Sequence, residues 1–149
     1  MSDDTRARAL VEAVTRRPGY TSSIDTVVLD ARPGSVELAL PRRPDLLQFS
    51  GAMHGGVIAG LADHAAGGAV TTALPEGRIG LTIDLGVTYL SAADGDRMVA
   101  RARAVHIGTT IAVAHVDLYT GADDGGSERL CATARATFRV VDLSPEPTP

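Results

Sequence analysis

The sequence predicts an α+β domain in which a curved antiparallel sheet of about six strands wraps around one long central helix. The stretch from Phe49 to Ala73 is rich in alanine, lacks proline and is followed by Leu74-Pro75, as expected of a long helix. Downstream segments alternate apolar and polar residues with the period of two that is typical of strands. These segments are residues 78–91, 96–107, 109–120 and 128–140. The central helix is the only long element able to cover the apolar face of such a sheet.

Three shorter elements are predicted before the central helix. Residues 4–16 have the apolar spacing of a short amphipathic helix. The β-branched run from Ile24 to Asp30 and the alternating run from Ser35 to Leu40 predict a hairpin, because Arg32-Pro33-Gly34-Ser35 is a turn sequence. Residues 41–51 are rich in proline and predict a loop that leads into the helix.

Turn residues divide the second half of the chain into strands at hairpin spacing. These turns are predicted at Asp94-Gly95, Gly108 and Asp124-Gly125-Gly126. Over residues 78–91, strict alternation places the odd-numbered residues, from Ile79 to Tyr89, on one face of the strand. It places Thr82 and Asp84 on the other face. We expect a single domain over residues 1–143, followed by a disordered tail of residues 144–149.

Composition excludes several classes of protein. The net charge of −4 argues against general nucleic-acid binding, which needs a basic surface. The single cysteine, Cys131, excludes an intrachain disulfide, and its position in a predicted strand favours a buried structural thiol. Without a signal-peptide pattern or a long apolar span, the expected location is cytoplasmic.

The sequence His54-Gly55-Gly56 lies where the loop becomes the helix. The first amides of a helix have no partner within it and carry partial positive charge, so they can polarise a carbonyl oxygen. Glycine there lets an acyl group approach the backbone. On its own this motif is weak, because a histidine at a helix start is more often a cap or a packing residue.

Asp63 is the only carboxylate in the central helix, and its neighbours on the helix are alanines and glycines. Such a carboxylate is costly unless it is exposed, paired or used in chemistry. It follows His54 by nine residues, about 13.5 Å along the axis and on the opposite helix face. If both residues serve one site, two copies of the chain must supply them. The alternative is an Asp63 that faces solvent.

The segment HGGVIAGLAD, together with LLQFSGAM before it and VTYLSAADGD after it, resembles the hotdog-fold thioesterases of the phenylacetate-pathway (PaaI-like) type. The resemblance covers about residues 44–140. It implies that Gly55, with Gly56, polarises a thioester carbonyl at the helix start that His54 opens. It also implies that Asp63 of a neighbouring subunit acts as nucleophile or general base. Gln48 would help to bind the carbonyl or water, and Thr82 would hold the water.

Other polar residues have both a possible binding role and a structural alternative. Arg101, Arg103, Gly108 and Thr109 are candidates for binding the coenzyme A phosphates, although strand faces carry such charges routinely. Asp84 shares a predicted face with Thr82 but is more typical of an exposed residue. His64 is expected to be structural or interfacial. No metal site is expected, because His54 faces away from Asp63.

The predicted function is hydrolysis of an acyl-CoA thioester to a free acid and CoA, without a cofactor beyond the CoA of the substrate. A homodimer or a dimer-of-dimers tetramer is expected, with no nucleic-acid or membrane partner. The alternatives are a hotdog hydratase or dehydratase acting on acyl-CoA or acyl-carrier-protein, and a non-catalytic acyl-CoA-binding protein. The acyl group itself is left open.

Overall fold

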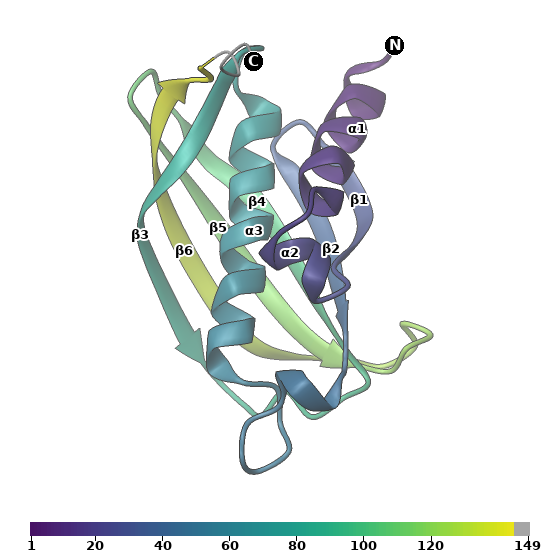
Figure 1. Ribbon diagram of the computed structural model, residues 1–149. Coiled ribbons are helices and arrows are strands. Elements are labelled where there is room, and N and C mark those ends of the chain that lie inside the picture. The colour runs from purple at the N-terminus through teal and green to yellow at the C-terminus, as the bar shows by residue number, and fades with distance from the viewer. Residues whose placement is uncertain (145–149) are drawn as a thin grey trace.

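The computed structural model describes residues 1–144 and consists of a six-stranded sheet curved around a long helix, α3 (Figure 1). The predicted fold is therefore confirmed. In chain order the elements are α1 (Asp3–Arg16), α2 (Tyr20–Ser23), β1 (Val27–Arg32), β2 (Ser35–Pro41), the 3-10 helix η1 (Pro44–Leu46), α3 (Gly55–Ala73), β3 (Arg78–Tyr89), β4 (Arg97–Ile107), β5 (Ile111–Gly121) and β6 (Glu128–Asp142). Most of the predicted tail, residues 145–149, lies outside the described residues.

The strands follow the order β1-β2-β4-β5-β6-β3, and every pair is antiparallel. The hairpin predicted at Asp94-Gly95 is wrong, because β3 pairs with β6 and not with β4. Residues 90–96 instead cross the end of the sheet beneath the start of α3, where the Met53 amide donates to the Ala93 carbonyl. In the sheet, β3 and β4 lie three strand spacings apart, which is about 14 Å. The extended segment of residues 90–96 is long enough to span that distance.

The face of α3 that packs on the sheet consists of small residues. Ala62, Ala65, Ala66 and Ala69 are completely buried. Glycines allow further close contacts: Gly67 lies against Phe138 of β6, and Gly68 lies against Val36 of β2. Gly60 lies against the ring of Tyr20 in α2. These glycines therefore mark positions at which neighbouring side chains come close to the helix. A helix with short side chains can sit deep in a curved sheet, which fixes its position closely.

The helix begins at Gly55, not at Phe49. His54 is its N-cap, and the His54 Nδ1 accepts a hydrogen bond of 2.9 Å from the Gly56 amide. Residues 47–53 form a tight loop before it, closed by a bridge between Leu47 and Met53. Gly51 adopts φ 90° in this loop, a left-handed conformation that favours glycine.

A β-bulge interrupts the register of β3 on β6 between Thr82 and Asp84. Thr82 lies opposite the buried Phe138 on the helix side of the sheet, whereas Asp84 lies opposite Thr137 on the outer side. The predicted shared face of Thr82 and Asp84 is therefore wrong. A bulge adds one residue to a strand and so exchanges the two faces beyond it.

Helix α1 packs against β1 and α3, and a polar contact joins it to α3. The Thr15 hydroxyl donates to the Val11 carbonyl at 2.7 Å and lies 2.8 Å from the His64 Nε2. Since the hydroxyl has one proton, it accepts from the Nε2–H of His64. The expected structural role of His64 is thus confirmed. None of the helices within residues 1–144 is long and apolar enough to cross a membrane.

The first prediction concerns the pH dependence of stability. Burial lowers the pKa of His64 below its usual 6.5, and the neighbouring Asp63 carboxylate opposes this shift. The unfolded chain therefore binds the His64 proton more readily, so the free energy of unfolding falls as pH drops below about 6.5. We expect a smaller loss of stability in His64→Gln between pH 7.5 and pH 5, measured by urea denaturation. Identical pH profiles for both proteins would contradict this assignment.

The second prediction concerns the cap of α3. Replacing His54 by Ala removes the acceptor for the Gly56 amide and should lower the free energy of unfolding by about 1 kcal/mol. His54→Asn keeps a capping acceptor and should recover most of that loss. Denaturation at pH 7.5 measures both variants. If Asn is as damaging as Ala, the side chain of His54 stabilises the protein by another route.

Candidate active site

A pocket of about 540 Å³ opens at the start of α3. It brings together three of the predicted site residues, Gln48, His54 and Gly55. Apart from these, its walls are largely small or apolar: Phe49, Ala52, Met53, Ile58, Tyr89, Leu90, Ser91, Ala92 and Ala93. No side chain that lines the pocket carries a carboxylate, so the described chain supplies no acid there.

Only one amide at the start of α3 remains free among the described residues. The Gly56 amide is bound by His54, and the amides of Val57 and Ile58 both donate to the His54 carbonyl. Gly55 has no such partner, and its N–H is the free donor at this helix end. The carbonyl of the same peptide group accepts two hydrogen bonds, which polarises that N–H further. Gly56, predicted to assist, has its amide committed to the cap.

The contacts explain both glycines of the motif. A Cβ on Gly56 would lie 3.1 Å from the His54 Nδ1, so glycine leaves room for the ring to fold back as a cap. A Cβ on Gly55 would lie 3.3 Å from the Cζ and Oη atoms of Tyr89. Tyr89 also donates a 2.7 Å hydrogen bond to the Gly55 carbonyl. No site role was predicted for Tyr89, although it lies in the VTYLS segment that carried the resemblance.

Gln48 is held by a loop that is tied to the rest of the protein. The backbone N–H of Gln48 donates to the Ala52 carbonyl. Its side-chain Oε1 accepts a hydrogen bond of 2.9 Å from the backbone N–H of Ser50. The side-chain NH₂ group has no partner among the described residues and is available to a ligand. Phe49, at the tip of the same loop, is fully exposed.

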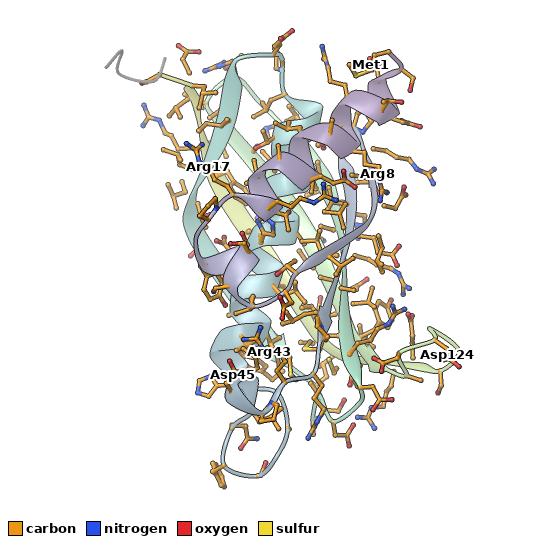
Figure 2. All side chains as sticks on the ribbon, turned by 45° about the vertical axis from the view of Figure 1, so that its right-hand side comes forward. Met1, Arg8, Arg17, Arg43, Asp45 and Asp124 are labelled. Atoms are coloured by element: carbon orange, nitrogen blue, oxygen red, sulfur yellow. The ribbon has the colours of Figure 1, made fainter. Side chains whose placement is uncertain are left out.

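An arginine clamp fixes the segment before this loop. Arg43 makes two hydrogen bonds to Asp45, of 2.7 and 3.0 Å, and one of 2.6 Å to Asp25 (Figure 2). The Arg43 guanidinium holds the pKa of Asp45 below its usual value through these bonds. The clamp joins η1 to the turn before β1 and so fixes the segment that leads to Gln48.

Asp63 and Thr82 form a second, separate cluster. The Thr82 hydroxyl donates to Asp63 Oδ1 at 2.7 Å, and Asp63 has no basic partner among the described residues. Asp63 is partly exposed on α3, and Thr82 is exposed on β3, which has no neighbour on its outer edge. The pair therefore faces the open edge of the sheet. Asp63 does not line the pocket of Gln48 and Gly55.

The residues predicted to bind the CoA phosphates do not join either cluster. Arg101 lies 2.8 Å from Glu128 and 3.3 Å from Glu37, and its guanidinium stacks on Tyr119. Arg103 is exposed on the same outer face of the sheet. Gly108 and Thr109 form the turn between β4 and β5, where the Gly108 amide donates to the Ile111 carbonyl. Arg101 thus has its charge matched within the chain.

Cys131 is completely buried, and its thiol lies 3.4 Å from the Leu118 carbonyl. Burial raises the pKa of this thiol, so the reactive thiolate is disfavoured. The predicted structural role of Cys131 is confirmed. Among the described residues, no group of three or more His, Cys, Asp or Glu side chains could hold a metal ion.

Comparison with known proteins identifies relatives along nearly the whole chain. A "putative esterase" of Halobacterium salinarum is 37% identical over 144 residues, which cover 93% of this chain and 95% of that protein. A thioesterase family protein of Silicibacter pomeroyi has a similar structure, with a TM-score of 0.85 and 30% identity. That match covers 91% of this chain and 98% of the other.

Two further structures bear on the predicted resemblance. PaaI of E. coli, from the phenylacetic acid degradation operon, shares the fold with a TM-score of 0.82 at 17% identity, over 94% of this chain and 96% of PaaI. A hypothetical thioesterase of Streptococcus pneumoniae, solved with coenzyme A, has a TM-score of 0.69 and 26% identity, over 79% and 87% of the two chains. The sequence profile of the thioesterase superfamily matches residues 50–127. The expected family is therefore confirmed, and this chain belongs to the thioesterase superfamily.

Proposed function

We propose that this protein hydrolyses acyl-CoA thioesters as a homodimer, with each active site built from two subunits. The observation that carries the proposal is the separation of the two clusters. One end of α3 offers a free amide and a free Gln48 NH₂ group but no carboxylate. The other cluster holds a carboxylate, Asp63, at an open sheet edge. Each cluster supplies what the other lacks.

The edge strand β3 favours a second copy of the chain as the partner. It is twelve residues long and leaves one edge unpaired. Leu81 is 51% exposed and Ile83 is 58% exposed on this strand. A long apolar edge is an aggregation hazard unless it is covered, and pairing of two such strands about a twofold axis covers both at once.

The same strand links the two clusters by its direction. Tyr89, near its end, contacts Gly55, while Thr82, nearer its start, contacts Asp63. Because the bulge adds one residue, two antiparallel β3 strands with a twofold axis near Leu85 would bring Thr82 of the partner subunit beside Val87 on the helix side, one position along that face from Tyr89. Asp63 of the partner subunit would then approach the pocket of Gln48 and Gly55. Such a register would join the two clusters without any change in the described chain.

In the proposed mechanism, the Gly55 amide and the Gln48 NH₂ group donate hydrogen bonds to the thioester oxygen. These bonds strengthen as the oxygen becomes an oxyanion. Asp63 of the partner subunit either takes a proton from water that attacks the carbonyl carbon, or attacks that carbon itself to form an anhydride that water then cleaves. In both routes the C–S bond breaks and the thiolate of CoA leaves. The Thr82 hydroxyl orients Asp63, and with it the water.

The substrate class rests on the family and on the streptococcal relative that binds coenzyme A. The small, apolar lining of the pocket suits a hydrophobic acyl group. No cofactor other than the substrate's CoA enters the proposal, and a cytoplasmic location stays a prediction from the sequence. A panel of acyl-CoA esters with a thiol-reactive dye tests the activity directly. CoA ester binding without thiol release would favour the acyl-CoA-binding alternative.

The third prediction is that Asp63→Asn lowers kcat by about 10²- to 10⁴-fold, because the carboxylate activates water or attacks directly. Asn keeps the size of the side chain and an oxygen to accept from Thr82, so the melting temperature should change little. The matched control is Asp117→Asn, which removes an exposed carboxylate of β5 that likewise accepts a hydrogen bond from a threonine, Thr133. Near-normal turnover in Asp63→Asn would refute the assignment.

The fourth prediction tests the shared site by mixing defects. Asp63→Asn and Gln48→Ala chains carrying different tags are coexpressed, and the mixed dimer is isolated by two affinity steps. One of its two sites then has both residues intact, so activity should return to about half of the wild-type value per dimer. Each mutant homodimer serves as the control. A mixed dimer as inactive as the homodimers would mean that the site lies within one chain.

A further inference from the structure

We propose that Tyr89 is a positioning residue for the Gly55 amide and that its ring forms a wall of the acyl pocket. The inference deepens the proposed function and rests on it. Tyr89 is the last residue of β3, where its backbone pairs with Ala132 of β6. From this fixed point its side chain reaches the first residue of α3. No other side chain of the described residues donates a hydrogen bond to the first turn of that helix.

The contact acts on the peptide that follows the free amide. The Gly55–Gly56 peptide is held at both ends: its carbonyl accepts from the Tyr89 hydroxyl at 2.7 Å, and its N–H donates to the His54 Nδ1 at 2.9 Å. With this plane fixed and the His54 carbonyl bound by two amides, the Gly55 N–H has one direction open to it. An oxyanion donor must be aimed in advance, since reorientation during the reaction would cost its advantage.

The ring has a second role that is separate from the hydroxyl. Its edge lies so close to Gly55 that a methyl group there would meet it at 3.3 Å, and the ring lines the pocket beside Leu90 and Ser91. Half of the side chain is exposed in the single chain. A ring in this position contacts whatever binds at Gly55. The hydroxyl should therefore affect kcat, and the ring should affect KM.

The test compares Tyr89→Phe with Tyr89→Ala. The Phe variant removes the bond to the Gly55 carbonyl and keeps the ring. We expect kcat to fall about five- to tenfold with KM within about twofold. The Ala variant should lower kcat similarly and also raise KM. Tyr119→Phe, which removes a hydroxyl on the outer sheet face, is the matched control and should leave both constants unchanged.

A spectroscopic measurement separates positioning from a general loss of structure. In ¹⁵N-labelled protein, Tyr89→Phe should move the amide resonances of Gly55 and Gly56, whereas Tyr119→Phe should not. The melting temperature reports folding. Wild-type kcat in Tyr89→Phe, or unmoved glycine resonances, would overturn the positioning role. Absence of thioester hydrolysis in the wild-type protein would instead refute the proposed function, while the resonance test of the contact would still stand.

Discussion

The close packing of α3 on the sheet is the constraint on which the other features depend. Its buried alanines leave no large side chain between much of the helix and the strands, so the helix axis lies near the sheet surface. At that short range, Thr82 on β3 can reach Asp63, and Tyr89 can reach Gly55. Larger side chains on this face would lift the helix and separate both pairs. The alanines and glycines of α3 thus determine the geometry of the site as well as the core.

The bulge in β3 is the second feature that determines the geometry of the site. Without it, the odd-numbered residues would stay on one face along the strand, and Thr82 and Tyr89 would lie on opposite faces. With the extra residue, both lie on the helix side and both contact α3. Bulges are frequent next to functional sites because they redirect one side chain without disturbing the rest of a strand. Here one inserted residue allows a single strand to contact both the start and the middle of the helix.

The sequence predicted where the two clusters lie on α3, but it predicted few of the contacts within them. The motif at residues 54–56 pointed to the start of α3, and the isolated carboxylate pointed to Asp63. Their spacing along the helix already required two copies of the chain for a common site. The sequence could not show which amide at the helix start is free, because that depends on the rotamer of His54. Nor could it find Tyr89, whose contact with Gly55 joins residues far apart in the chain.

The pattern of apolar residues and turns by itself determined the class of fold, the central helix and the strands, since these follow from local periodicity. The resemblance then gave the family and the residues that are candidates for chemistry. The tertiary structure decided the order of the strands, because a glycine turn at Asp94-Gly95 fits a crossing segment as well as a hairpin. It also decided which face Thr82 occupies, because alternation continues unbroken in the sequence through Ile83, where the bulge lies. Both depend on pairing between distant strands, and local sequence carries no record of such pairing.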